Sequence, residues 1–337
     1  MKKNGLTEIA KLAGVSVATT SRALNNTGYV SSKVKTKVLS AASKLGYIPT
    51  TASKKRRLGV IFTQFENNLC NFYRDAMLAE ISRQCSELDV SLEMVFPNNV
   101  TALEDNFIRT AIVLQRQEPE IRKKVRNVNF VSINGALDGV PDISTDNKWC
   151  MTTGIDYLIK NGCRKILLVI PNDCPSGMNR SLISKEIITQ ANINNKNNNI
   201  SLEILNLKTC NSVKESLKQA IFINQTDALF IAGEDMASMI TYELFQLGIK
   251  IPDDLSILSF EAPGSSCYMT PAHTTVQQDF SRLVSTALDW ALKINAGESI
   301  PNDRRLQIPG FFNERESVKQ IKTTNKSNEN MVLSKVI

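Results

Sequence analysis

Histidine is almost absent from this sequence of 337 residues, which contains only His273. Its seven cysteines are scattered, and no two of them form a C-x-x-C pair. Zinc sites need several His or Cys ligands close together, and a disulfide framework normally uses an even number of cysteines. We therefore expect reduced thiols, no metal site and no other cofactor. The single histidine is expected in a loop or an interface rather than in catalysis.

Long apolar runs and familiar catalytic motifs are absent too. No apolar run approaches 18 residues, and Lys2 and Lys3 are followed by polar residues, so the sequence predicts neither a membrane span nor a secretory signal. It contains no G-x-S-x-G, no phosphate-binding glycine loop and no H-x-x-x-H. We therefore expect a cytoplasmic protein that is not an enzyme. A sugar-processing enzyme that uses Glu261 and Asp235 as an acid–base pair remains an alternative.

Acidic residues are nearly missing from the first 57 residues, where Glu8 is the only one. The same stretch holds twelve Lys and Arg, so its net charge is +11, whereas the remaining chain sums to −4. A small basic module therefore precedes a mildly acidic body. This asymmetry predicts a polyanionic partner for the first part of the chain alone.

The basic module has the pattern of three short helices. Thr7 can cap a first helix that ends at Gly14, and Ser16 can cap a second helix over residues 17–24. A third helix is predicted for residues 32–45. Two short helices joined by a glycine-containing turn are typical of a helix-turn-helix, whose second helix enters the DNA major groove.

The predicted second helix carries small and hydroxyl-bearing side chains that permit a close approach to DNA. Val17 and Ala18 leave room at its start, and Arg22 can reach a guanine edge or a phosphate. Ser and Thr hydroxyls suit phosphate oxygens, which set register rather than sequence. The expected DNA contacts are Thr7, Ser16, Val17, Ala18, Thr19, Ser21, Arg22, Asn25, Tyr29, Ser31, Lys33, Lys54, Lys55 and Arg56. A basic bundle with another purpose is the alternative.

The stretch LTEIAKLAGVSVATTSRALNNTGYVSSKVKTKVLSAASKLGYIPT, residues 6–50, resembles the DNA-binding segment of the lactose-repressor (LacI/GalR) family. The family's A-G-V-S turn, T-x-S-R helix and final L-G-Y-x-P are all present. The resemblance implies a transcriptional regulator, which we expect to be a repressor. It would bind double-stranded operator DNA as a homodimer and respond to a small effector, a sugar or a phosphosugar. Thr20 departs from the usual core-facing Val, and its buried hydroxyl would cost about 1 kcal/mol unless it bonds back to the helix backbone.

The linker that follows differs from the family pattern. Family members usually carry a short hinge helix with a Leu that wedges into the minor groove. The segment before Leu58, where strand character begins, has no such Leu and carries Lys54, Lys55, Arg56 and Arg57 instead. These four basic residues could form a solvated linker, or a basic arm that follows the DNA phosphates. We expect DNA binding that is strongly salt-sensitive.

Strand-like and helix-like segments alternate through the rest of the chain, which predicts parallel sheets with helices on both faces. The expected fold class is α/β, with an N-terminal three-helix helix-turn-helix domain. The stretches GIKIPDDLSILSFEAP and SSCYMTPAHTTVQQDF resemble the same family and imply two Rossmann-like lobes of the periplasmic-binding-protein type. Crossings between the lobes are expected near residues 160, 278 and 305. The expected boundaries are 1–49 for the DNA-binding domain, 50–57 for a shortened basic hinge, 58–316 for the effector-binding and dimerisation domain (first lobe 58–160 and 279–304, second lobe 161–278 and 305–316) and 317–337 for a disordered tail.

Ligands of such sheets bind beyond the carboxyl ends of the strands, here between the lobes. The resemblance places an effector-contacting Arg at Arg180 and a hydroxyl-binding carboxylate at Glu261, where the family has Asp. The expected effector-binding residues are Tyr73, Arg74, Asp146, Trp149, Arg180, Glu234, Asp235 and Glu261. Arg74 and Arg180 together would suit a phosphosugar. Alternatively, the two aspartates cap helices, Trp149 belongs to the core and Arg180 lies on the surface.

The expected assembly is a dimer rather than a tetramer, because the C-terminal residues contain no leucine heptads. The predicted helix over residues 71–88 carries Met77, Leu78 and Ile81, which could form a dimer face or belong to the lobe's own core. An architectural DNA-binding protein without an effector is the remaining alternative.

Overall fold

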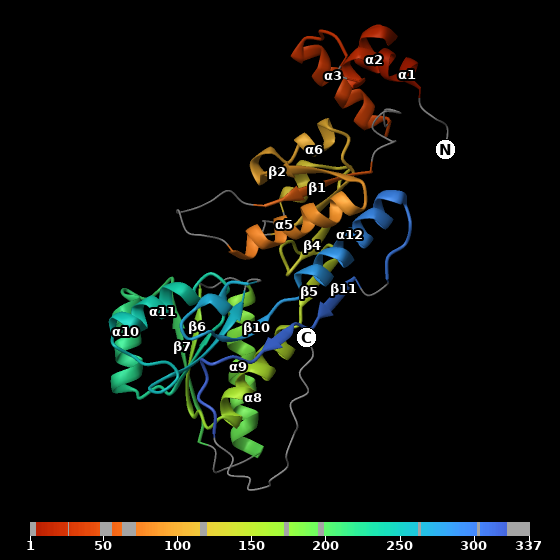
Figure 1. The fold of residues 1–337 in the computed structure, drawn as a ribbon. Helices are drawn as coiled ribbons and strands as arrows, with labels where there is room; N and C mark the ends of the chain where they lie inside the picture. Colours follow the sequence, from red (N-terminus) through yellow and green to blue (C-terminus); the bar gives the residue numbers. More distant parts are fainter. Residues whose placement is uncertain are drawn as a thin grey trace, which may run out of the picture.

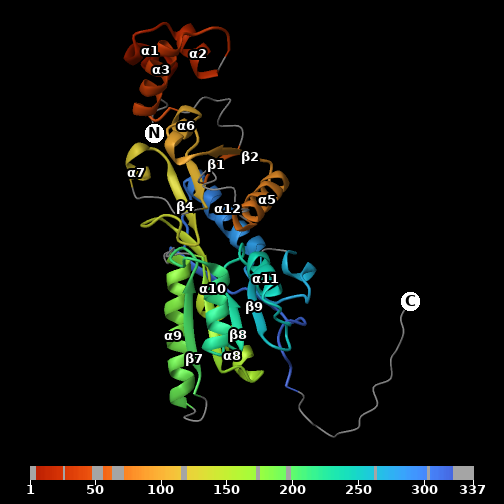
Figure 2. The ribbon, with the colours of Figure 1, turned by 90° about the vertical axis from the view of Figure 1, so that its left-hand side faces the viewer.

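A small helical module and two α/β lobes follow one another along an elongated molecule, with the module beyond the first lobe and the second lobe at the far end (Figures 1 and 2). The computed structural model describes residues 5–25, 27–47, 56–62, 72–114, 120–171, 175–194, 199–261, 264–301 and 304–321. Within these ranges no helix is both long and apolar enough to span a membrane. The predicted class, α/β with an N-terminal helix-turn-helix, is confirmed.

The helical module consists of α1 (Leu6–Ala13), α2 (Val17–Asn25) and α3 (Ser32–Lys44). α1 begins directly after Gly5, so Thr7 lies inside the helix and is not the cap that the sequence predicted. Gly14 ends α1 in the left-handed region with φ 69°, a conformation that glycine adopts without steric cost. Ile9 and Val38 are buried where the three helices meet.

The first lobe is built on a parallel sheet with the strand order β11-β5-β4-β3-β1-β2. Its strands are β1 (Arg56–Ile61), β2 (Val90–Val95), β3 (Thr110–Val113), β4 (Asn129–Ile133), β5 (Asp142–Thr145) and β11 (Arg305–Ile308). Its helices are α5 (Phe72–Glu87) and α12 (Phe280–Ala296) on one face, and α6 (Ala102–Asp105) and α7 (Ile121–Lys124) on the other, with η1 (Pro97–Asn99) after β2. β1 begins at Arg56 rather than at Leu58, because Arg56 and Arg57 already pair with β2. The basic linker is therefore shorter than predicted.

The second lobe is built on a sheet with the strand order β12-β10-β9-β8-β6-β7. Its strands are β6 (Lys165–Ile170), β7 (Ser201–Asn206), β8 (Ala228–Ile231), β9 (Ser256–Glu261), β10 (Thr274–Gln277) and β12 (Phe311–Asn313). Its helices are α8 (Asn147–Lys160) and α9 (Pro175–Asn194) on one face, and α10 (Val213–Lys218), η2 (Gln219–Ile223) and α11 (Ala237–Gln246) on the other, with η3 (Ser266–Tyr268) after β9. Only β12 runs antiparallel to its neighbour among the strands described in this sheet.

The chain crosses between the lobes at positions that differ from two of the predictions. β5 ends at Thr145 in the first sheet, whereas α8 packs on the second, so the first crossing lies near Asp146 and not near residue 160. The second crossing connects β10 to α12 at 278–279. β11 pairs with β5 in the first lobe, so the third crossing lies at 309–310 rather than near residue 305. Apolar periodicity identifies a helix or strand but not which of two sheets it joins.

Residues 317–321 pack on the second lobe, contrary to the prediction of a disordered tail from residue 317. The Ser317 hydroxyl donates a hydrogen bond to the Ile257 carbonyl at 2.5 Å, and the Ile257 N–H donates to the Ser317 carbonyl at 2.7 Å. Val318 is buried in the apolar core. Residues 322–337 lie outside the described ranges.

Gly310 lies where two of the crossings touch. A Cβ atom at this position would lie 2.2 Å from the backbone oxygen of Gln277. Because that oxygen can move only if both connections shift, we expect Gly310→Ala to lower the free energy of unfolding by about 2 kcal/mol. Urea unfolding followed by circular dichroism measures the loss. Gly5→Ala is the control, because its added Cβ meets no atom within 4 Å. A G310A variant as stable as the wild type would contradict the close approach.

Candidate DNA-binding surface and interlobe site

The start of α2 presents short side chains to solvent. Ser16 caps this helix, because its Oγ accepts a hydrogen bond from the Thr19 backbone N–H at 3.1 Å. Val17, Ala18 and Arg22 are exposed. Short side chains at a helix start let the backbone come close to base edges, and a nearby Arg can reach a guanine or a phosphate. The surface that the sequence predicted for DNA recognition is therefore free for a partner.

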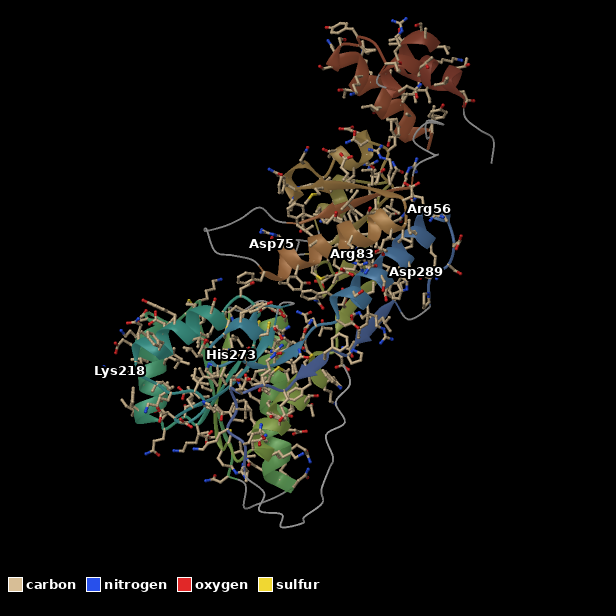
Figure 3. The ribbon with its side chains drawn as sticks, viewed as in Figure 1. Arg56, Asp75, Arg83, Lys218, His273 and Asp289 are labelled. Atoms are coloured by element: carbon tan, nitrogen blue, oxygen red, sulfur yellow. The ribbon has the colours of Figure 1, made fainter. Side chains whose placement is uncertain are left out.

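The remaining expected DNA contacts are mostly on the surface. Thr7, Asn25, Tyr29, Ser31, Lys33 and Arg56 are exposed, whereas Thr19 and Ser21 are half-buried. The Tyr29 ring is 91% exposed, which leaves it open to a partner. Arg56 belongs to the first lobe rather than to the helical module (Figure 3). Lys54 and Lys55 lie outside the described residues.

Thr20, which stands where the family usually has Val, is completely buried. Its hydroxyl donates a hydrogen bond to the Ser16 carbonyl at 3.0 Å, one turn earlier in the helix. The polar group is therefore satisfied, and the departure from the family pattern leaves no unpaired group in the module's core.

Gln278 lies on the second crossing and joins the two lobes. Its Oε1 accepts hydrogen bonds from Asn134 Nδ2, at 2.9 Å, and from Thr145 Oγ1, both in the first lobe. Its Nε2 donates to Glu234 Oε1 in the second lobe. The residue is 2% exposed, so these contacts are shielded from water. The sequence did not single out Gln278 or Asn134, although Gln278 lies at a predicted crossing.

Asn134 extends these contacts to Tyr73. Its Nδ2 also donates to the Tyr73 hydroxyl oxygen at 2.9 Å, and its Oδ1 accepts from the Thr145 N–H at 2.7 Å. Asn134 follows β4 with φ 54°, which Asn tolerates better than most residues. The Tyr73 ring packs edge-on against Phe280. Burial raises the pKa of the Tyr73 phenol, so the group remains a neutral hydroxyl.

Asp235 makes a second contact between the lobes. Its Oδ1 accepts a hydrogen bond from the Tyr73 backbone N–H at 3.4 Å. Partial burial raises the pKa of this carboxyl to about 6, and the neighbouring Glu234 adds to the rise. Asp235 does not cap α11, whose cap residue is Met236. The alternative that Asp235 is a helix cap is therefore wrong.

Arg180 is buried on the second-lobe side of this site. Its guanidinium lies 3.6 Å from the centre of the Phe260 ring, its Nε donates to Asn147 Oδ1 at 3.0 Å and its Nη1 donates to the Ala232 carbonyl at 2.9 Å. Its Nη2 lies 3.7 Å from Glu234 Oε1. Arg180 is therefore not the surface residue that one alternative proposed. It places a fixed positive charge beside Glu234.

Arg74 does not combine with Arg180 into the predicted phosphate-binding pair. Its Nε and Nη2 both donate to Asp75 Oδ1, at 2.9 and 2.7 Å, and its side chain is buried on α5. Asp75 lies near the start of α5 (Figure 3). Asp75 neutralises the charge of Arg74, and Glu234 neutralises that of Arg180. The two arginines therefore do not form a site with two unpaired positive charges for a phosphate.

Asp146 and Trp149 have structural roles at the first crossing. Asp146 caps α8, because its Oδ1 accepts from the Trp149 N–H at 2.9 Å. The Trp149 side chain is half-buried and packs against the apolar core of the second lobe. The structure thus favours the capping and core alternatives for these two residues.

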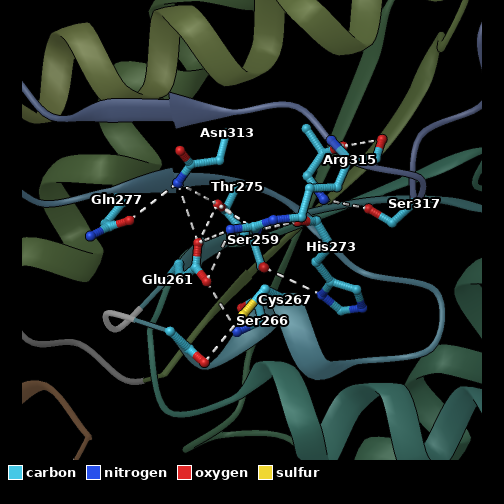
Figure 4. A network of polar contacts seen from close by, with 12 residues as sticks. Ser259, Glu261, Ser266, Cys267, His273, Thr275, Gln277, Asn313, Arg315 and Ser317 are labelled. Atoms are coloured by element: carbon cyan, nitrogen blue, oxygen red, sulfur yellow. Dashed lines mark hydrogen bonds and ion pairs between the residues drawn. The ribbon is translucent and has the colours of Figure 1, made fainter. Parts of the chain in front are cut away.

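Glu261 ends β9, but its carboxylate lies within a hydrogen-bond network of the second lobe (Figure 4). Oε2 forms an ion pair with Arg315 Nη2 at 3.0 Å and accepts from Thr275 Oγ1 at 2.7 Å. Oε1 accepts from the Ser266 backbone N–H at 3.1 Å. Glu261 is 1% exposed, and these contacts hold its carboxylate within the second lobe. Its role in effector binding stays a prediction.

His273 lies in the loop directly before β10, as the sequence predicted, and its side chain is buried inside the second lobe (Figure 3). Its Nδ1 is 3.3 Å from Ser259 Oγ, and its Nε2 is 3.2 Å from Thr241 Oγ1. Burial lowers the pKa of the imidazole to about 4, with Arg315 contributing, so the ring is neutral at physiological pH. The predicted loop position is therefore confirmed, and the ring belongs to the interior of the lobe.

Comparison with known proteins gives two family matches and several similar proteins. The family described as "Bacterial regulatory proteins, lacI family" matches residues 5–50, and "Periplasmic binding protein-like domain" matches residues 155–318. The probable HTH-type transcriptional repressor ExuR of Bacillus subtilis is 26% identical over 94% of this chain and 98% of its own length. The sucrose operon repressor of Streptococcus mutans is 26% identical over 90% and 96%.

Solved structures share the fold over most of the chain. The lac repressor dimer bound to operator and the anti-inducer ONPF has a TM-score of 0.64 and 20% identity, and covers 94% of this chain and 99% of its own. A LacI family regulator from Enterococcus faecium with bound ribose has a TM-score of 0.66 and 17% identity over 79% and 100%. The motifs, the fold and both domain matches agree, and the chain belongs to the LacI family of bacterial regulatory proteins.

Proposed function

We propose that this chain is a transcriptional repressor that binds operator DNA as a homodimer and responds to a small sugar held between its lobes. The observation that carries the proposal is the exposed face of α2 with Arg22, within a stretch of 57 residues of net charge +11 that precedes a remainder of −4. Such a module attracts DNA and leaves the body free for control. The similar proteins named as repressors support this reading. A bacterial repressor acts on the chromosome, so we place it in the cytoplasm.

The interlobe site supports a neutral sugar rather than a phosphosugar. Arg180, Glu234, Gln278 and Asn134 offer both donors and acceptors for hydroxyl groups, and the Tyr73 ring provides an apolar face. The similar structures include one with bound ribose and one described as a CelR–cellobiose complex. A bound sugar would replace the hydrogen bonds that Gln278 makes to both lobes. It would thereby change the free-energy difference between two arrangements of the lobes, by about 1–3 kcal/mol in typical allosteric proteins.

We also propose that the chain is not an enzyme. The alternative acid–base pair required Glu261 and Asp235 to face one substrate. Glu261 is instead enclosed by Arg315 and the Ser266 N–H, whereas Asp235 contacts the first lobe through Tyr73. The two carboxylates therefore do not form a pair with access to a bound sugar.

The proposed dimer includes an exposed apolar face of the second lobe. Met239, Tyr242 and Phe245 follow one another at spacings of three along α11, and Tyr268 lies on η3. Their exposures range from 39% to 87%. A surface of this kind favours coverage by a second copy of the chain. Met77 and Ile81 of α5, the other candidate face, are fully buried in the core of the first lobe.

Selection of DNA by the full-length protein tests the proposal. We expect it to enrich a near-palindromic sequence from a randomised pool. Arg22→Ala is expected to weaken binding to that sequence by about 1–3 kcal/mol, or roughly tenfold to a hundredfold, and to relax selection at one base pair of each half-site. Fluorescence anisotropy at fixed salt measures both. Lys148→Ala, an exposed charge in the second lobe, is the control. Failure to enrich any two-fold symmetric sequence would defeat the proposal.

A further inference from the structure

The helical module rests directly on the first lobe, at the turn between α6 and β3 (Figures 1 and 2). The Phe107 side chain, from this turn, packs against the apolar core of the module. Asn127 Nδ2 of the first lobe donates a hydrogen bond to Ser43 Oγ of α3 at 2.9 Å. These residues border one small crevice together with Tyr47. The two parts are therefore joined by side-chain contacts as well as by the linker.

Phe107 has a backbone conformation that needs an explanation. It follows Asn106, the C-cap of α6, with φ 57°, and the Phe107 N–H donates to the Glu104 carbonyl while the Ile108 N–H donates to the Leu103 carbonyl. This hydrogen-bond pattern is a Schellman motif, in which the left-handed position is usually glycine. A bulky residue there is a steric outlier, and such outliers cluster at functional sites. Here the unfavourable backbone places an aromatic ring against another domain.

The first lobe holds this turn in one shape. Glu104 Oε1 accepts hydrogen bonds from the N–H groups of Arg126 and Asn127, both at 2.9 Å, and so fixes the position of Asn127. Arg57, at the start of β1, donates to the Asn106 carbonyl at 2.8 Å. The contact surface for the module is therefore formed within the first lobe itself.

Charge also favours the contact. Partial burial raises the pKa of the Asp105 carboxyl, Glu104 adds to the rise, and Lys35 of α3 opposes it. Lys35 therefore lies near an acidic turn of the first lobe. The contact uses α3, whereas the exposed start of α2 with Arg22 takes no part in it. A module held in this way can still bind DNA.

We propose that Phe107, Asn127 and Ser43 form a dock that fixes the orientation of the DNA-binding module, and that the dock sets the spacing of operator half-sites. This inference rests on the proposed dimeric repressor. The segment that precedes β1 lacks the Leu that a wedging hinge helix would need. In a dimer, one module binds its half-site first and the module of the other subunit binds next. A fixed orientation of both modules lowers the entropy cost of that second step.

Operator spacing tests the dock in the full-length protein. The palindrome selected by the wild type is lengthened at its centre by one, two and three base pairs, and a single half-site is measured beside it. Phe107→Asn removes the ring but keeps a residue that tolerates the left-handed conformation. We expect F107N to bind the original operator about fivefold to tenfold more weakly, to bind the half-site as the wild type does and to lose less affinity as the centre is lengthened.

A pair of serines on α3 provides the matched control. Ser43→Ala removes the hydrogen bond to Asn127, whereas Ser40→Ala makes the same change at an exposed position of the same helix. S43A is expected to lose operator affinity in the same way as F107N but to a smaller extent. S40A is expected to bind every operator as the wild type does. Thermal unfolding verifies that each variant folds. The dock would be overturned if F107N and S43A lost affinity with operator length just as the wild type does. It would also be overturned if each variant lost as much affinity for the half-site as for the operator. A wild type that selects no operator would instead defeat the proposed function.

Discussion

Replacing Glu261 with Ala is expected to lower the free energy of unfolding by about 3–5 kcal/mol. The substitution leaves Arg315 without its carboxylate in a largely buried position. It also removes the acceptor of the Thr275 hydroxyl and of the Ser266 N–H, both of which are buried. An unpaired buried donor costs free energy because water cannot replace the lost partner. The loss is therefore larger than that of a surface ion pair.

Urea unfolding followed by circular dichroism measures this loss. Glu261→Gln keeps the shape and one acceptor, so its loss is expected to fall between those of the wild type and E261A. Asp289→Ala is the control, because Asp289 pairs with Lys293 at 2.7 Å on the exposed face of α12 and should cost no more than about 0.5 kcal/mol. If E261A were no less stable than D289A, the buried ion pair would not hold the segment after β12 to the rest of the second lobe.

The helix-turn-helix was accessible from the sequence because its determinants are local. Gly14 and Ser16 set the turn through hydrogen bonds with residues three or four positions away. The hydrogen bond predicted for the Thr20 hydroxyl likewise needs only the Ser16 carbonyl, one turn earlier. The one local error, the cap at Thr7, arose because Gly5 precedes the helix and leaves Thr7 inside it. Signals of this range are readable without knowledge of the tertiary fold.

The site between the lobes was only partly accessible, because its contacts join residues far apart in the chain. Glu261 was correctly placed at a strand end, but its direction depends on Arg315, 54 positions later. Gln278 was missed because an isolated glutamine carries no sequence signal until Asn134 and Glu234 are seen beside it. The same reason explains the misplaced first crossing, since nothing local assigns α8 to the second sheet.

Replacing Arg180 with Met is expected to weaken effector binding by about 2–5 kcal/mol, at least about thirtyfold. Met keeps an unbranched apolar side chain at this position, but it lacks the guanidinium that lies over the Phe260 ring. It removes the donors to Asn147 and to the Ala232 carbonyl, and it leaves Glu234 without a cation. A sugar would then meet a site with an uncompensated carboxylate and fewer fixed donors. Binding of DNA does not use this residue.

Arg180 can therefore be tested by separating the two activities. A thermal-shift screen of neutral sugars with the wild type identifies the ligand, because a ligand that binds the folded state raises the unfolding temperature. Calorimetry with R180M then measures the lost affinity, and anisotropy on operator DNA without sugar is expected to remain within about threefold of the wild type. Lys185→Met removes an equal charge from the exposed side of the same helix and is expected to change neither measurement. If R180M and K185M bound the sugar equally well, Arg180 would have no part in the effector site, and the charge pairing with Glu234 would serve the stability of the second lobe alone.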